Sequence, residues 1–263
     1  MTKNGIDRKL SIRGIKEAQV LMDQLSKSSS ILATAFGRAG DDFLCKAFNV
    51  EDYEIDSLEA QKFMGIIVYF SLDMLYEFLR PKTTERKILR ILNRTLKIVH
   101  HEISCLKGKI YSNGMYSYYA IWRFEEELGE KELFSALSSE DKKNYFRTKM
   151  TGKAEVAFSA LFIAIFKIKI FIREYMHYKH NKINMKAEHT VGFILHAGTG
   201  FEGAQGSCSK ADLVVFGKDL SIAKKLSPHS STYKSDLLVT EFACTLLTPE
   251  VVLIDTDSPP LPV

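Results

Sequence analysis

Residues 92–124 read LNRTLKIVHHEISCLKGKIYSNGMYSYYAIWRF and contain two patterns in succession. The first is helical, because apolar residues recur every three or four positions and Gly108 then ends the run. The second is a hairpin, because Asn113-Gly114 lies between two runs rich in Tyr, Ile and Trp. The helix begins after Pro81, at Thr83-Thr84, and is expected over about 85–106. Its apolar stripe comprises Leu89, Leu92, Leu96, Val99 and Ile103.

The segments on either side of this stretch supply the rest of a sheet. Upstream, residues 63–70 (FMGIIVYF) have the short, continuous apolar character of a buried strand. Downstream, strands and helices follow one another without an internal repeat, which favours an α+β fold with helices on one face of a sheet. The expected downstream elements are a helix at 153–179, strands at 190–196, 213–216, 237–239 and 251–254, and helices at 219–227 and 241–247.

The chain is expected to hold one main domain. Residues 1–29 are predicted to form a basic N-terminal helix or extension, and residues 30–254 to form the domain. Within it, residues 125–150 are charged and irregular, which indicates a surface insertion. Residues 255–263 (DTDSPPLPV) are expected to be an unstructured tail.

Composition excludes several classes of protein. The 263 residues are 46% hydrophobic with a net charge of +4, which is typical of a globular protein and not of a disordered one. The four cysteines are far apart and lack metal-ligand spacing, so free thiols and no metal site are expected. No secretory signal is visible, and the apolar run 156–166 is about half of the ~20 residues that a spanning helix needs. A cytoplasmic protein that does not span a membrane is therefore expected.

Three stretches resemble the catalytic domain of class III nucleotide cyclases, in particular the form found in ciliates and related protists. Residues 92–124 are similar to the family's helix and GDAF-type hairpin. Residues 191–226 (VGFILHAGTGFEGAQGSCSKADLVVFGKDLSIAKKL) are similar to its GLHxGxxxxGxxGS segment, K-x-D motif and VNxASRL helix. Residues 35–44 (AFGRAGDDFL) and 65–78 (GIIVYFSLDMLYEF) resemble its upstream glycine segment and its first strand. The resemblance covers about residues 30–250 and implies a ferredoxin-like βαββαβ core, with an antiparallel-rich sheet and helices packed on it.

The family's catalytic residues are replaced in this chain. Cyclases use two aspartates to hold two metal ions, and an Asn and an Arg to orient the ribose and stabilise charge. By position, the aspartates correspond to Ser71 and Met115, and the Asn and Arg correspond to Ser221 and Lys225. Methionine does not bind a hard cation such as Mg²⁺, and lysine lacks the guanidinium fork. The resemblance therefore implies a pseudoenzyme with no catalytic residues, no metal and no cofactor.

Two acids leave alternatives open. The purine-reading lysine and acid of the family correspond to Tyr111 and Asp212, so nucleotide sensing without turnover would depend on Asp212 and the glycines of residues 196–207. Against this, Asp212 next to Lys210 can be an ordinary surface acid. Asp73 could replace Ser71 as the first metal ligand after a two-residue shift in register, but this leaves Met115 unexplained.

Two surfaces are candidates for contact with other molecules. Glycines such as Gly198 and Gly203 lack the spacing of a phosphate-binding loop, so we expect them to lie in a strand-turn-strand crossing at the family's subunit contact. The helix 85–106 also carries a basic face opposite its apolar stripe. Such a face is usually only solvated, but it could bind nucleic acid, an anionic lipid head group or an acidic protein. The absence of interleaved aromatic residues argues against single-stranded nucleic acid, and an acidic protein is the partner that we expect if the face binds anything. The basic residues are Arg86, Arg90, Arg94 and Lys97.

The sequence thus predicts a catalytically inactive subunit that helps to assemble a larger protein complex. Its partners would bind the former cyclase dimer face, formed by the glycine-rich segment and helix 219–227, and the basic helix. The ciliate character of the resemblance suggests a ciliary axoneme as its location. The alternative is a regulatory, non-catalytic half of a heterodimeric nucleotide cyclase.

Overall fold

The computed structural model describes residues 19–24, 26–27, 60–124, 139–179, 191–207 and 210–248. The chain divides into two compact units, Met1–Tyr53 and Glu54–Val263. In the first, residues 19–24 and 26–27 are helical. The second holds the sheet described below. The predicted tail 255–263 and strand 251–254 lie outside the described residues, and the predicted domain limits at 29/30 and 254/255 stay predictions.

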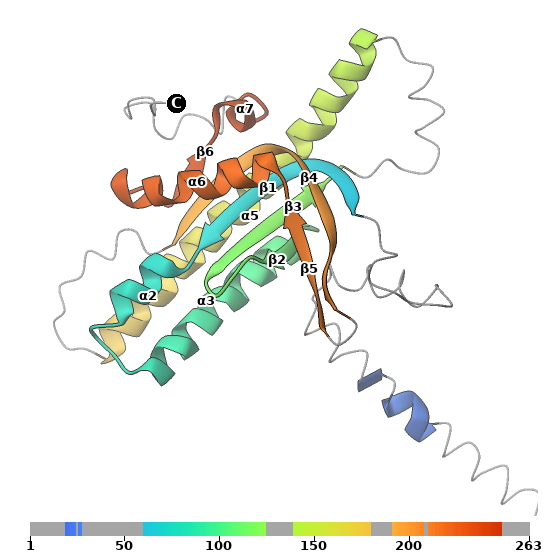
Figure 1. The fold of residues 1–263 in the computed structure, drawn as a ribbon. Coiled ribbons are helices and arrows are strands. Elements are labelled where there is room, and N and C mark those ends of the chain that lie inside the picture. Colours follow the sequence, from blue (N-terminus) through green and yellow to red (C-terminus); the bar gives the residue numbers. More distant parts are fainter. Residues whose placement is uncertain are drawn as a thin grey trace, which may run out of the picture. The chain divides into compact units, whose positions relative to one another are not determined.

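Within the described ranges, six strands form one sheet (Figure 1). The strand order is β2-β3-β1-β4-β5, and β6 pairs with β4 in parallel, whereas every other pairing is antiparallel. With helices between β1 and β2 and between β3 and β4, this is the ferredoxin-like βαββαβ arrangement that the resemblance implied. The strands are β1 (Gln61–Ser71), β2 (Lys109–Ser112), β3 (Ser117–Arg123), β4 (Gly192–Ser207), β5 (Lys210–Phe216) and β6 (Leu237–Val239).

Helices cover both faces of this sheet. α3 (Glu85–Cys105) and α5 (Ser139–Lys179) share one core with Ile66, Val68 and Phe70 of β1. α6 (Lys218–Thr232) packs against the other face, where the Tyr119 hydroxyl donates to the carbonyl of Leu220 at 3.0 Å. In Figure 1, α6 therefore lies in front of the sheet and α3 and α5 behind it. Two shorter helices are α2 (Asp73–Leu79) and α7 (Glu241–Cys244).

Several sequence expectations need correction. The prediction that helices cover only one face of the sheet is wrong, because α6 packs on the opposite face from α3 and α5. The segment predicted as a strand-turn-strand crossing is instead continuous strand, because its residues pair first with β1 and then with β5. Residues 139–150, expected in an irregular insertion, begin α5. On α3, Leu89 is exposed, and Ile88 and Ile91 are buried in its place.

Three further features of the described residues concern membranes, thiols and metals. No helix in the described residues is long and apolar enough to cross a membrane. Cys105 and Cys244 are free thiols, and Cys45 and Cys208 lie outside the described residues. No group of three or more metal-ligating side chains occurs within the described part of the chain.

Gly65 allows β1 and β3 to approach closely, and this gives a first prediction. A Cβ atom at Gly65 would lie 2.3 Å from the carbonyl oxygen of Trp122, so Gly65→Ala should lower the free energy of unfolding by about 1–3 kcal/mol. Urea unfolding followed by circular dichroism measures this. The control is Gly152→Ala on α5, which meets open space and should raise stability by about 1 kcal/mol. Equal unfolding midpoints for Gly65→Ala and the wild type would contradict the close approach.

His196 gives a second prediction, on pH. It is buried on β4, with its Nδ1 2.9 Å from the Thr240 hydroxyl. Burial lowers its pKa, although the nearby charge of Asp219 acts in the opposite direction. As the pH falls below about 6.5, the unfolded chain therefore takes up this proton before the folded chain does, and stability decreases.

Urea unfolding at a series of pH values between about 7.5 and 5.5 measures this effect. The contribution from His196 has a slope of at most about 1.4 kcal/mol per pH unit. His196→Gln should remove it and flatten the curve. A curve with the same slope in the variant would show that other groups cause the dependence.

Candidate functional site

The position of the first metal aspartate lies at the end of β1, where Ser71 is buried. The Ser71 hydroxyl donates to Asp73 Oδ2 at 2.6 Å and accepts from the backbone N–H of Asp73 at 3.1 Å. Asp73 is exposed and is the first residue of α2. Its carboxylate is thus engaged in a local turn at the beginning of a helix. The structure accounts for Asp73 without a metal ion.

The position of the second metal aspartate lies in the β2–β3 turn. Gly114 has φ of 114°, as a tight hairpin turn requires, and the next residue, Met115, is 79% exposed. The turn is next to the end of β1, because Ser71 pairs with Ser117 and Leu72 N–H donates to Tyr116 O at 2.8 Å. The fold therefore brings the two metal positions together, but it places a serine hydroxyl and a thioether there.

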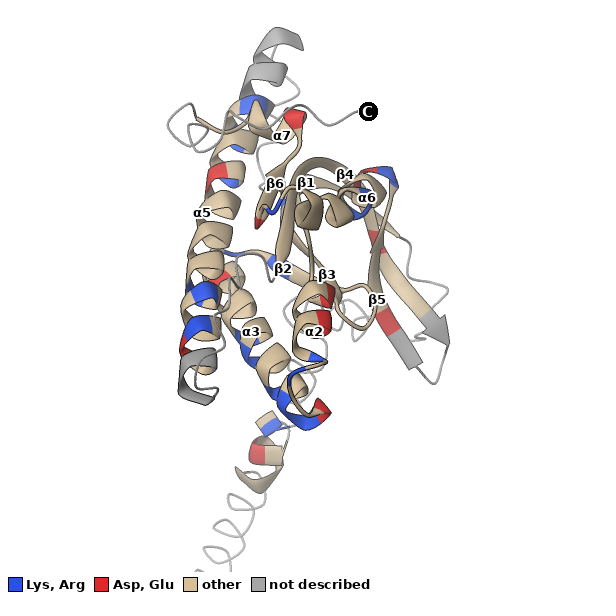
Figure 2. Cartoon of the chain, turned by 90° about the vertical axis from the view of Figure 1, so that its left-hand side faces the viewer, with Lys and Arg blue, Asp and Glu red and all other residues tan. Residues whose placement is uncertain are grey.

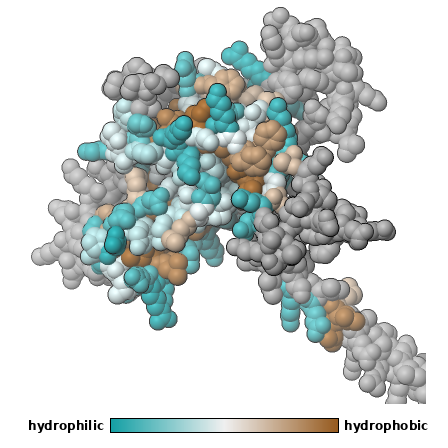
Figure 3. Space-filling model, in the orientation of Figure 1, coloured by the Kyte–Doolittle hydropathy of each residue, from teal (hydrophilic) through white to brown (hydrophobic). Residues whose placement is uncertain are grey.

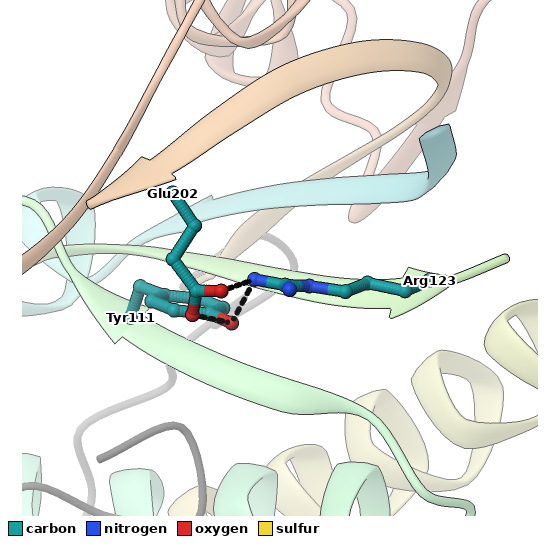
Figure 4. A network of polar contacts seen from close by, with 3 residues as sticks. All are labelled: Tyr111, Arg123 and Glu202. Carbon is teal, nitrogen blue, oxygen red and sulfur yellow. Dashed lines mark hydrogen bonds and ion pairs between the residues drawn. The ribbon is translucent and has the colours of Figure 1, made fainter. Parts of the chain in front are cut away.

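Tyr111, at the purine-reading lysine position, belongs to a network with Glu202 and Arg123 (Figure 4). Tyr111 is only 2% exposed, and its hydroxyl donates to Glu202 Oε1 at 2.7 Å. Arg123 Nη2 donates to the Tyr111 oxygen at 3.1 Å and forms an ion pair with Glu202 Oε2. The network thus connects β2, β3 and β4 across one face of the sheet.

Most polar atoms of this network bond to one another, and the Arg123 Nε is buried without a hydrogen-bond partner among the described residues. Burial, and the charge of Glu202 as a lesser effect, raise the pKa of the Tyr111 hydroxyl far above its ordinary value, so the phenol stays neutral. Its proton is engaged with Glu202, and its oxygen accepts from Arg123. The Arg123 guanidinium also lies over the ring of Phe63, at 5.1 Å from the centroid. The position where cyclases present a lysine to the base is therefore occupied by a side chain that bonds within the chain.

Asp212, the predicted partner of Tyr111, is exposed on β5 and pairs in register with Gln205. The acid that the Tyr111 hydroxyl contacts is Glu202 on β4. Sequence reasoning missed both Glu202 and Arg123. The available signal was that each is a lone charged residue in an otherwise apolar or glycine-rich strand.

The positions of the catalytic Asn and Arg lie one turn apart on α6. Ser221 and Lys225 are both exposed, and the Ser221 hydroxyl donates to the carbonyl of Gly217 at 3.0 Å. Neither belongs to the Tyr111 network. The three parts of the family's site are thus represented by a polar turn, a closed cluster and a solvated helix surface.

The predicted interface residues lie on two separate surfaces. Gly198 lies against Asp219 at the beginning of α6, and Asp219 accepts the backbone N–H of Thr199 at 2.6 Å. Gly203 lies further along β4, near Ala60. The four basic residues Arg86, Arg90, Arg94 and Lys97 are all exposed on α3.

Comparison with known proteins supports the fold and nothing finer. No family model and no curated protein matches the chain. The chain is similar to a bacterial light-regulated adenylyl cyclase, with a TM-score of 0.61 and 15% identity over 90% of this chain and 59% of that one. It is also similar to the adenylyl cyclase CyaB from P. aeruginosa, with a TM-score of 0.52 and 14% identity over 72% of this chain and 82% of that one.

The chain thus spans less than two thirds of the light-regulated cyclase and most of CyaB. Sequence identity is low in both cases, whereas the order and pairing of the strands form a ferredoxin-like sheet with an added β5–α6–β6 unit. On these grounds the chain has the fold of the catalytic domain of class III adenylyl and guanylyl cyclases.

Proposed function

We propose that this chain is a catalytically silent protein with a cyclase fold, which acts by binding another protein within a larger complex. The observation that carries the proposal is the network of Tyr111, Glu202 and Arg123. A purine base would need a donor and an acceptor at this place, but the Tyr111 hydroxyl, the Glu202 carboxylate and the Arg123 Nη2 already bond to one another. A nucleotide that used these groups would have to break a partly buried ion pair, which is unfavourable.

The metal positions support the same proposal. Two-metal catalysis needs oxygen ligands that bridge both ions. Met115 offers a thioether that is exposed to solvent, and the carboxylate of Asp73 accepts a hydrogen bond from Ser71. Ser221 and Lys225, on α6, lack the amide and the guanidinium fork that orient a ribose and a triphosphate.

A hydrophobic surface on β4 and β5 is the place where we propose that a partner binds. Phe201 and Phe216 are 40% and 50% exposed, and their rings stack with centroids 5.7 Å apart. The two residues are opposite each other in the register of β4 and β5. Figure 3 shows hydrophobic residues on the surface where β4 and β5 meet. Exposed aromatic pairs of this kind mark binding surfaces in soluble proteins.

The identity of the partner would decide both the cellular location of this chain and the choice between the two candidate functions. A ciliary axoneme is the location that we propose, and it rests on the ciliate character of the sequence resemblance alone. A regulatory, non-catalytic half of a heterodimeric cyclase is the second candidate, because the structural neighbours are themselves adenylyl cyclases. That role requires a partner with both metal aspartates.

The third prediction concerns nucleotides. Calorimetric titration of the full chain with Mg-ATP and with Mg-GTP should show no saturable heat up to about millimolar ligand, a limit that corresponds to a binding free energy of about −4 kcal/mol. An active cyclase domain is the positive control. Saturable heat that Asp212→Ala abolishes would identify a nucleotide sensor and would contradict the proposal.

The fourth prediction concerns the partner. Tagged chain purified from its own cells should carry a protein partner, and Phe201→Ser/Phe216→Ser should reduce its recovery about tenfold or more. The matched control is Phe162→Ser/Phe166→Ser, which removes two exposed phenylalanines of α5 and should leave recovery unchanged. Localisation of the tagged chain outside cilia would contradict the axonemal part. A partner that carries both metal aspartates and makes cyclic nucleotide only with this chain would establish the regulatory half instead.

A further inference from the structure

The outer surface of α3 and α5, which we name the helix-layer face, contains the predicted basic interface residues of α3 and lies apart from the Tyr111 network. The two helices lie side by side on one side of the sheet. Lys167 of α5 bonds to Glu102 of α3 at 2.6 Å, and Arg94 of α3 lies over the ring of Phe171, at 4.9 Å. These contacts set the helices antiparallel, with the beginning of α3 next to the C-terminal half of α5.

An apolar ridge runs along the outside of α5. Phe162 and Phe166 are 55% and 61% exposed, and Ile163 and Ile170 are exposed beside them. The ring of Phe162 stacks on that of Phe158, with centroids 6.4 Å apart. The opposite side of the helix is packed into the core. A helix that is apolar on all sides is ordinarily covered on all sides, so this ridge calls for an apolar neighbour.

Basic residues lie on the same surface. α3 presents exposed cations over four turns, and its sequence has no Asp or Glu between Glu85 and Glu102. α5 likewise has no Asp or Glu between Glu155 and Glu174. Figure 2 shows the Lys and Arg residues along α3 and along the part of α5 beside it. The exposed cations are Arg86, Lys87, Arg90, Arg94 and Lys97 on α3, and Lys167, Lys169 and Arg173 on α5.

We propose that the helix-layer face binds the surface of an anionic lipid membrane. The ridge from Phe162 to Ile170 is about 12 Å long, and its side chains are exposed on the side of α5 that faces away from the core. A lipid interface accepts protruding phenylalanines without a matching groove, while anionic head groups attract the cations around them. The protein would lie on the membrane and not cross it.

Charge argues for lipid over a second copy of this chain. In a symmetric dimer the same surface meets itself, so the two basic rows would face each other and repel. An acidic protein would satisfy the charge, but it would also need a groove shaped to the ridge. The proposal does not depend on the proposed function, because it uses exposed residues of α3 and α5, whereas that function uses Phe201 and Phe216 of β4 and β5.

Binding of the full chain to vesicles tests the proposal. The probes are vesicles of phosphatidylcholine alone and of phosphatidylcholine with phosphatidylserine, and the readout is cosedimentation over a range of salt concentrations. We expect binding to the anionic vesicles that weakens as salt rises. Phe162→Ser/Phe166→Ser should weaken it about tenfold or more, and Arg90→Ser/Lys97→Ser about thirtyfold at low salt.

Matched variants on α6, which packs on the other face of the sheet, are the controls. Ile222→Ser and Lys224→Ser/Lys225→Ser remove an exposed apolar residue and two exposed cations and should bind vesicles as the wild type does. Thermal unfolding by circular dichroism checks that every variant is folded.

Four results would overturn the proposal. The first is no binding to anionic vesicles, and the second is equal binding to neutral ones. The third is a change in sedimentation coefficient for Phe162→Ser/Phe166→Ser without lipid, which would identify a contact between copies. The fourth is that the chain binds polyglutamate as tightly as it binds anionic vesicles, and that Phe162→Ser/Phe166→Ser does not weaken the binding to polyglutamate. This result would indicate an acidic protein partner.

Discussion

Pairing of β1 with strands on both of its sides positions almost every other part of the molecule. Residues 61–71 pair with β4, and residues 65–71 also pair with β3. Alternate residues then point to opposite faces: Ile66 toward α3 and α5, and Ile67 away from them. A slip of one residue would exchange these faces and destroy both cores. The same register places Ser71 opposite Ser117 and so brings the end of β1 to the β2–β3 turn.

Local sequence patterns predicted much of this fold, because several helices, strands and turns have a characteristic local sequence. The Asn113-Gly114 turn, the apolar run of β1 and the periodicity of α3 all follow from short-range chemistry. The prediction of a strand-turn-strand crossing for the glycine-rich segment was wrong, because long-range pairing and not local sequence decides its structure. Glycine weakens a strand in isolation, but here Gly198 pairs with Gly65 and Gly200 with Phe63, so tertiary pairing overrides propensity. The prediction that Leu89 is buried was also wrong, because one apolar residue of a helical stripe can lie on the solvent side.

Residues of the candidate site could be predicted only where a single position in the sequence was informative without its partners. Tyr111 stood out because it replaces a lysine in the family resemblance, and the structure shows where its hydroxyl goes. Its partners could not be found this way, because Glu202 lies 91 residues from Tyr111 and 79 from Arg123. No spacing rule connects such residues, and only the order and register of β2, β3 and β4 bring them together. Asp212 illustrates the converse, since it matches the family by residue type, whereas the acid that bonds to the Tyr111 hydroxyl is Glu202.

The two ion pairs on either flank of α5 have a consequence for how this helix can move. Lys167 is bound to Glu102 on the side of α3, and Lys169 is bound to Asp236, just before β6, on the other side. Any rotation of α5 about its own axis would pull one lysine out of reach of its acid. These ion pairs therefore oppose rotation of α5 about its own axis. The exposed phenylalanines of α5 keep the same orientation whether or not another molecule is bound. Contact with this surface would cost little orientational entropy, and a contact that required the helix to turn would first have to break an ion pair.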